Sequence, residues 1–331
     1  MTERRSRFWL TSVVVGIALA VPAMAPNTYV LHLLVTTCIW AILAVSMNLI
    51  LGVTGLLSLA HGALFGIGGY TSALLVVRAG MNFWPALALA AVAAGLGGLL
   101  IGLPTLRSRG PYFVIASLCF GLVVQIVIDK WEALTFGPLG VTSIPAASPI
   151  VIPGIGKITF DSLPAQYYLV LALLMLAIFV VRRVVNSRIG RAFQAIRVNE
   201  NLGEALGVPV MRLALLSFVI SGMIAGAAGS VYAMYISYLN PADAGFWVAL
   251  NGILFVVVGG VGTVAGPIVG AFVMTILPET FRLFAEFRLF IFGLLLIVVI
   301  IFLPEGIVGG LGRFWRFLRR RSPERSWPPN A

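Results

Sequence analysis

Long apolar runs separated by short polar segments make up most of the chain. A helix needs about 20 mostly apolar residues to cross the roughly 30 Å hydrocarbon core of a bilayer, and nine runs approach that length. They cover Phe8–Met24, Tyr29–Leu51, Gly55–Val77, Trp84–Leu103, Tyr112–Ile128, Tyr167–Val181, Leu213–Ile236, Val248–Leu277 and Leu289–Leu303. This pattern predicts an all-α fold, a polytopic transmembrane helical bundle that forms a single transmembrane domain over residues 1–331.

The composition supports a membrane protein. Hydrophobic residues make up 60% of the chain and charged residues only 10%, whereas a soluble domain carries about 25% charged residues. Soluble enzymes, secreted disulfide scaffolds and disordered proteins are therefore excluded. Cys38 and Cys119 both lie in apolar runs, so we expect two small apolar side chains rather than a disulfide. Two cysteines and two histidines also predict no metal site.

The distribution of charge predicts the orientation of the chain. Lys and Arg outnumber Asp and Glu by 22 to 11, a net charge of +11, and cytoplasmic loops of membrane proteins collect Lys and Arg. Arg4, Arg5 and Arg7 place the N-terminus in the cytoplasm, and the basic tail over residues 313–331 places the C-terminus there as well. The charge is thus a topology signal, and it predicts no nucleic-acid partner.

Two cytoplasmic termini require an even number of crossings, which we expect to be 8 to 10. The count depends on Val248–Leu277, which is interrupted by the glycine-rich stretch Gly259–Pro267. This run is either a re-entrant pair of half-helices, with broken helices inside the membrane, or two shallow, tilted crossings. The first run also ends in Ala23-Met24-Ala25, which resembles a signal-peptidase site, so a cleaved signal peptide is an alternative to a first span.

Two connections between the runs are long. Residues 131–166 contain five prolines and predict an ordered, non-helical periplasmic loop. Residues 186–212 are charged and rich in helix formers, and a helix there would place Phe193, Ile196 and the stem of Arg197 on one face. Such a helix can dock into a groove on a soluble partner; a solvated connector helix is the alternative. Gly207 and Pro209 end the helix.

Charged residues are missing from the middle of the predicted spans. Ionisable side chains at membrane depth usually mark proton relays or ion sites, and here only His32 and His61 titrate within apolar runs. A stand-alone secondary transporter or channel is therefore disfavoured. If the chain transports a solute uphill, we expect its energy to come from another subunit.

Two glycine-rich interruptions predict the substrate pathway. Broken helices are tolerated at membrane depth only where protein or a wet cavity satisfies the freed backbone groups, and transporters use such breaks to direct backbone dipoles at a substrate. The predicted pathway residues are Asn48, Ser58, His61, Gly62, Gly259, Gly260 and Thr263. Close helix packing through small residues is the alternative. An intramembrane enzyme is disfavoured because Ser58 and His61 have no acidic partner, and no catalytic residue is expected.

Five segments together resemble the permease family of branched-chain amino acid ABC transporters, the LivM-type inner-membrane subunit. The segments are Gly55–Leu75 (GLLSLAHGALFGIGGYTSALL), Arg107–Ile115 (RSRGPYFVI), Ser187–Gly229 (SRIGRAFQAIRVNENLGEALGVPVMRLALLSFVISGMIAGAAG), Val256–Gly270 (VVVGGVGTVAGPIVG) and Phe302–Gly306 (FLPEG). They occur in the order and spacing of the family between about residues 40 and 310.

The resemblance implies an importer of branched-chain or other hydrophobic amino acids that works by alternating access in the bacterial inner membrane. The implied partners are a second homologous permease, two ATP-binding-cassette ATPases and a periplasmic solute-binding protein. The chain itself would bind no cofactor, and the ATPases would use ATP and Mg. The segment Glu204–Gly207 resembles the Glu-Ala-Ala…Gly loop of ABC permeases. This likeness makes residues 186–212 the coupling-helix loop, with Glu200, Glu204, Ala205, Leu206 and Gly207 at the ATPase.

The chain departs from the family pattern at three positions. Many members carry Glu and Arg where this chain has Leu122 and Gln125, and Asn or Asp where it has Leu139. These losses of polar side chains leave the substrate open between a more apolar amino acid and a related amide or carboxylate such as urea.

Overall fold

The computed structural model describes residues 27–280, apart from 109, 153–155 and 206, together with residues 305–310 and the isolated positions Gly16, Pro22, Gly293 and Ile301. Most of the predicted first run, most of the last run and the basic tail over residues 313–331 therefore lie outside the described residues.

The described chain is mostly helical, which confirms a polytopic helical bundle. Five helical segments are long and apolar enough to cross a membrane. They are α2 (Thr28–Met47) with its π-helical extension η1 (Asn48–Thr54), α4 (Phe83–Thr105), α5 (Pro111–Lys130), α7 (Leu163–Val185) and α10 (Val210–Ile236). Three shorter apolar helices accompany them: α3 (His61–Val77), α11 (Phe246–Gly259) and α12 (Gly266–Thr280).

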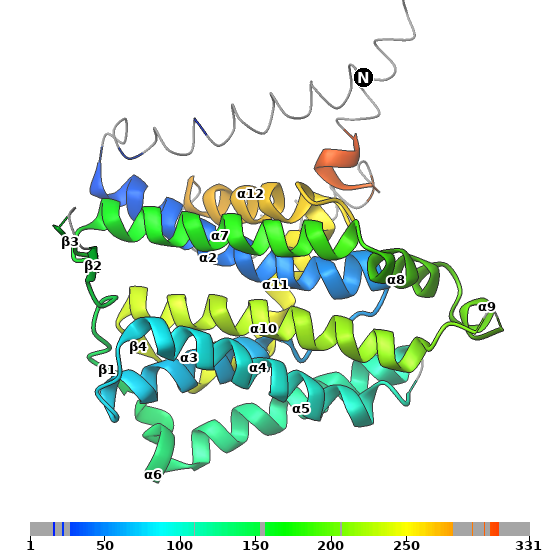
Figure 1. Ribbon diagram of the computed structural model, residues 1–331, viewed down its shortest axis with the longest axis horizontal. Helices are drawn as coiled ribbons and strands as arrows, with labels where there is room; N and C mark the ends of the chain where they lie inside the picture. Colours follow the sequence, from blue (N-terminus) through cyan, green and yellow to red (C-terminus); the bar gives the residue numbers. More distant parts are fainter. Residues whose placement is uncertain are drawn as a thin grey trace, which may run out of the picture.

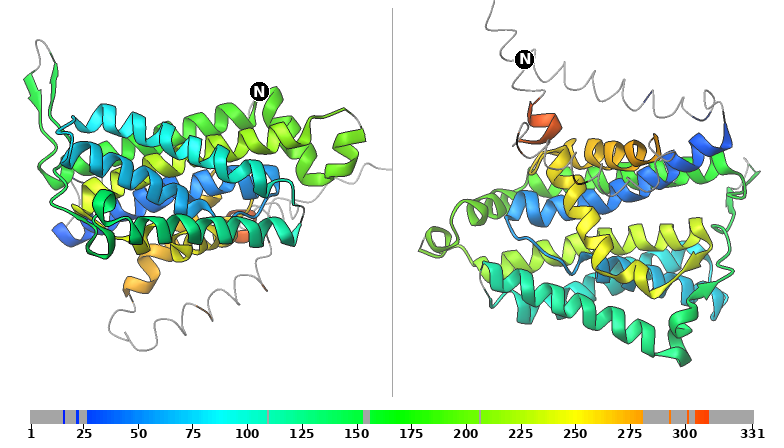
Figure 2. Two further views of the ribbon diagram at one scale, coloured as in Figure 1. Left: turned by 90° about the horizontal axis from the view of Figure 1, so that it is seen from below. Right: turned by 180° about the vertical axis from the view of Figure 1, so that it is seen from behind.

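The helices form two groups that lie side by side. One group contains α2, α7 and α12, and the other contains α3, α4 and α10, with α5 along its edge (Figure 1). Helix α11 runs diagonally from the second group to the first, as Figure 2 shows from behind. We call the end of the bundle that carries α8 (Arg188–Val198) and α9 (Glu200–Ala205) the α8 end, and the opposite end the far end.

Small residues set the close approach of α3 and α10. A methyl group built on Gly68 would lie 2.2 Å from the Cα atom of Gly226, and one built on Gly229 would lie 1.9 Å from the carbonyl oxygen of Phe65. Helices in a membrane associate through this kind of backbone contact, because lipid is as apolar as their side chains and gives no hydrophobic driving force. The packing interpretation of the glycines therefore holds along this seam.

Aromatic side chains join the two groups. Trp40 of α2 stacks on Phe65 of α3 with ring centroids 5.8 Å apart, and Tyr232 of α10 and Phe255 of α11 pack against the same indole. Aromatic pairs of this geometry add to the stabilisation that burial alone gives. The cluster holds α2, α3, α10 and α11 together in the interior.

The far end departs from the prediction of an all-α fold with a non-helical loop. The loop contains the short helix α6 (Glu132–Thr135), the 3-10 turn η2 (Gly137–Leu139) and the strands β1 (Val141–Thr142), β2 (Ile150–Ile152) and β3 (Gly156–Ile158). Strand β1 pairs with β4 (Tyr238–Leu239) and β2 with β3, both antiparallel. The pairs satisfy backbone groups that the proline-rich sequence cannot place in a long helix. The loop also ends earlier than expected, because α7 begins at Leu163.

Candidate functional site

Helix α8 lies across the end of the bundle with one face buried. The Ser187 hydroxyl caps it by accepting a hydrogen bond of 3.2 Å from the backbone N–H of Gly190, as N-cap residues do. Phe193 and Ile196 are buried on the same face, against η1, α7 and α10. The predicted amphipathic helix is confirmed, and its apolar face is turned to the bundle rather than to a partner.

The first glycine-rich stretch is a broken helix. Helix α2 continues as the π-helix η1, Gly55 then takes a left-handed conformation with φ of 85°, and α3 starts only at His61. π-helical segments are rare and frequently lie at functional sites. The non-helical residues between them are supported by α5, because the backbone N–H of Leu59 donates to the Ser117 hydroxyl at 3.0 Å. The expected single run Gly55–Val77 is therefore helical only from its seventh residue.

The second glycine-rich stretch is also broken, between α11 and α12. Thr263 closes the turn: its hydroxyl donates to the carbonyl of Gly260 at 2.9 Å and accepts from the N–H of Gly266 at 2.9 Å. Residues 305–310 lie against this turn, since a methyl group on Gly306 would come within 2.4 Å of the Cα atom of Gly260. Part of the Phe302–Gly306 motif thus packs on the second break.

Asn48 joins the two breaks. Its side-chain amide donates to the carbonyl of Thr263 at 2.8 Å, and its side-chain oxygen accepts from the N–H of Gly262 at 2.9 Å. The side chain is almost fully buried, with 2% of its surface exposed. A buried amide must find such partners, because leaving it unpaired costs about 1–3 kcal/mol. The structure therefore brings Asn48, Gly259, Gly260 and Thr263 together.

Ser58, His61 and Gly62 form a second group at the start of α3. Ser58 and His61 are completely buried, and the imidazole packs against Phe218 of α10 with ring centroids 5.9 Å apart. A methyl group on Gly62 would lie 2.1 Å from the carbonyl oxygen of Gly245, just before α11. The predicted pathway residues thus lie at both ends of the non-helical stretch rather than in one cluster, and their role in transport remains a prediction.

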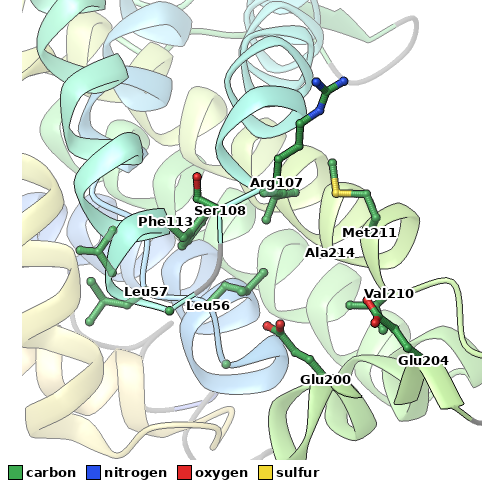
Figure 3. Close-up of a pocket in the computed structure, with 14 residues that line it drawn as sticks. Leu56, Leu57, Arg107, Ser108, Phe113, Glu200, Glu204, Val210, Met211 and Ala214 are labelled. Carbon is green, nitrogen blue, oxygen red and sulfur yellow. The ribbon is translucent and has the colours of Figure 1, made fainter. Parts of the chain in front are cut away.

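A cavity of about 620 Å³ opens at the α8 end beside α9. Glu200 and Glu204 line it from α9, Leu56 from the stretch after η1, Arg107 and Ser108 from the connection before α5, and Val210 from the start of α10. Figure 3 shows the Glu200 carboxylate directed toward Leu56, whereas the Arg107 guanidinium points away. Two of the predicted coupling residues, Glu200 and Glu204, therefore border a concave surface, and Arg107 of the RSRGPYFVI segment is a lining residue that the sequence patterns did not predict.

Glu204 and the remaining predicted coupling residues lie at the end of α9. Glu204 and Ala205 are exposed, and Gly207 is exposed with a left-handed backbone at φ of 78°. Leu206 lies outside the described residues. Among the residues that the structure describes, no three His, Cys, Asp or Glu side chains gather as a metal site would require.

The three departures from the family pattern differ in their surroundings. Leu122 and Leu139 are exposed on α5 and η2, and the carbonyl of Leu139 accepts a hydrogen bond of 3.3 Å from Tyr238. Gln125 instead lies beside Gly245, where its side-chain oxygen is 2.8 Å from the position of a methyl group on that glycine. Gln125 therefore lies beside the residue that also contacts Gly62, one of the predicted pathway residues.

Comparison with known proteins shows the family. The family described as branched-chain amino acid transport system / permease component matches residues 29–301. The permease protein LivM of the high-affinity branched-chain amino acid transport system of Salmonella typhimurium is 31% identical over 88% of this chain and 72% of its own length. LivM of Escherichia coli is also 31% identical, over 82% of this chain and 68% of its own length.

A more distant relative carries a different name. The galactofuranose transporter permease protein YtfT of Escherichia coli is 29% identical over 68% of this chain and 62% of its own length. No solved structure matches the chain. The family match over most of the sequence and the similarity to the LivM proteins show that this chain belongs to the permease-component family of branched-chain amino acid ABC transport systems, multi-pass membrane proteins that are not themselves catalytic.

Proposed function

We propose that this chain is one of two permeases that form the pathway of an importer for branched-chain or other hydrophobic amino acids in a bacterial inner membrane. The names of the LivM relatives support the substrate class. The observation that carries the mechanism is the position of α8, which contacts the first helix break and, through Arg197, reaches the second. A helix outside the spans therefore touches the backbone that we expect to line the pathway.

The proposed topology has ten crossings with both termini in the cytoplasm. The turn between α11 and α12 reaches Arg197 at the α8 end, and α12 returns toward the far end, where Tyr29 at the start of α2 donates a hydrogen bond to Glu279. This path favours two short, tilted crossings over a re-entrant pair. The basic α8 end is then cytoplasmic, in line with the enrichment of Lys and Arg there, and the loop of residues 131–162 is periplasmic.

The proposed mechanism is alternating access driven from outside the chain. A second homologous permease completes the pathway, two ATP-binding-cassette ATPases use ATP and Mg at the α8 end, and a periplasmic binding protein delivers substrate at the far end. Closure of the ATPases displaces residues 186–212, and the two helix groups rock about the pathway. No cofactor is bound by this chain. Substrate contacts at the breaks are weak, because a substrate that binds too tightly cannot leave.

Uptake by the complete complex tests this function. We expect vesicles that hold both permeases and the ATPases to accumulate labelled leucine only with ATP on the ATPase side and the binding protein on the other. Collapse of the ion gradients should leave uptake unchanged. Gradient-driven uptake by this chain alone would instead identify a secondary transporter. ATP-driven uptake of labelled galactofuranose or urea, without uptake of leucine, would move the substrate to another class.

Thiol labelling tests the pathway residues. In a Cys38→Ala, Cys119→Ala background, we expect Ser58→Cys and Thr263→Cys to react with a small polar thiol reagent at rates that change when ATP or substrate is added. Ser217→Cys is the matched control for Ser58→Cys, because Ser217 is as buried as Ser58 but bonds within its own helix α10 to the carbonyl of Ala214, and it should stay unreactive. If Ser58→Cys and Thr263→Cys are also inert in every state, these residues serve packing alone.

A further inference from the structure

Arg197 in the last turn of α8 extends into the membrane-spanning part of the fold. Its guanidinium donates a hydrogen bond to the carbonyl oxygen of Gly52 in the π-helix η1. Hydrogen bonds from a charged donor are roughly twice as strong as neutral ones. Arg197 is therefore hydrogen-bonded to a backbone group of the first break, although part of its side chain is exposed at the α8 end.

Glycines from both breaks surround this side chain. A methyl group on Gly55 would lie 2.9 Å from Cγ and 3.1 Å from Cα of Arg197, and one on Gly262 would lie 2.4 Å from its guanidinium nitrogen. Both glycines have a left-handed backbone, with φ of 85° and 82°, which other residues adopt at a cost. Gly55 and Gly262 leave room for the arginine because they have no side chains, and Gly52 supplies the carbonyl acceptor; we call this site the arginine slot.

The arginine slot lies where the connections between the two helix groups meet. Helix α8 follows α7 of the first group and leads through α9 to α10 of the second, and η1 leads from α2 to α3 in the same way. The Gly262 turn connects α11 to α12 and is bonded to η1 through Asn48. A displacement of α8 must therefore either carry both breaks with it or break the bond of Arg197 to Gly52.

We propose that Arg197 is the positioning residue through which α8 moves both broken helices, so that ATP hydrolysis in the partner subunits is converted into opening of the pathway. This inference rests on the proposed function. It identifies Arg197 as the residue that transmits the movement of α8 to the two breaks. If Arg197 only held α8 against the bundle, its loss would not change the amount of substrate transported per ATP hydrolysed.

The test compares uptake and ATP hydrolysis in the reconstituted complex. Arg197→Met keeps an unbranched stem and removes the guanidinium, and Arg183→Met is the matched control, because Arg183 is exposed in the last turn of α7, at the same end of the bundle but outside residues 186–212. We expect Arg197→Met to lower leucine uptake about ten-fold or more, the effect of losing a hydrogen bond to a charged group, while ATP hydrolysis persists. Arg197→Lys should restore part of the uptake, and Arg183→Met should change neither rate.

A second variant, Gly262→Ala, covers the case in which Arg197→Met does not fold, and a double-substitution cycle applies where both variants fold. Gly262→Ala places a methyl group in the arginine slot from the other side, so it should uncouple in the same way, and the double variant should be no worse than either single one. Parallel loss of uptake and ATP hydrolysis, unchanged coupling, or additive effects would overturn the inference. If the unsubstituted complex shows no ATP-driven uptake, the proposed function fails instead.

Discussion

Gly207→Asp should abolish uptake and the co-purification of the ATPases without removing the chain from the membrane. The reason lies in the surroundings of Gly207, where a methyl group would meet nothing within 4 Å. Its φ of 78° is left-handed, and Asp adopts that conformation more readily than most residues. The substitution therefore leaves this chain intact, and its effect must come from a carboxylate placed where we expect the ATPase to dock.

Gly80→Asp is the matched control for this prediction. Gly80 also has a left-handed backbone, with φ of 61°, and open space around it, but it follows α3 at the far end. It should keep uptake and ATPase binding within about two-fold of the unsubstituted protein, the effect of a surface change of at most about 0.5 kcal/mol. Glu204→Lys, on the exposed side of α9, should behave as Gly207→Asp does. Normal uptake in both α9-end variants would refute the coupling role of residues 186–212.

Gly229→Ala should prevent the protein from folding stably. The added methyl group would lie 1.9 Å from the Phe65 carbonyl oxygen and 2.8 Å from its carbon. Backbone atoms cannot turn away as a side chain can, so α3 and α10 would have to separate. We expect a loss of more than about 3 kcal/mol, above the usual range for overpacking, seen as aggregation in size-exclusion chromatography and a lowered melting temperature in detergent.

The control for that experiment is Gly252→Ala in α11. Its methyl group would lie 3.6 Å from the terminal carbon of Met47, an ordinary contact, and Ala favours helix over Gly by about 1 kcal/mol. The variant should melt at or slightly above the temperature of the unsubstituted protein. A Gly229→Ala protein as stable as this control would mean that α3 and α10 do not approach as closely as the structure has them.

Much of the bundle could be predicted from the sequence because each span is defined by local composition. The runs around α4, α5, α7 and α10 were placed to within a few residues, and the helical period put Phe193 and Ile196 on one face of α8. The two breaks were also visible, since clustered glycines and polar residues interrupt an apolar pattern. These features depend only on residues that are close together in the sequence.

The contacts that join the breaks could not be predicted, because they pair residues far apart without a periodic signal. Asn48 bonds to the backbone of Thr263 across 215 positions, and Arg197 bonds to the backbone of Gly52 across 145. The helical period predicts the stem of Arg197 on the same face as Phe193 and Ile196, but no pattern shows which carbonyl its guanidinium meets. The two-residue pairing of β1 with β4 was missed for the same reason, since backbone pairing of this length leaves no alternation of side chains.

The seam between α3 and α10 also bears on how the protein is made. Gly68 and Gly226 touch, but the ribosome adds about 160 residues between them, which takes roughly 10–30 s at about 5–20 residues per second. Through that interval the glycine face of α3 has no permanent neighbour in the bilayer. Slowing translation after α4 therefore lengthens the period in which this face is exposed to lipid.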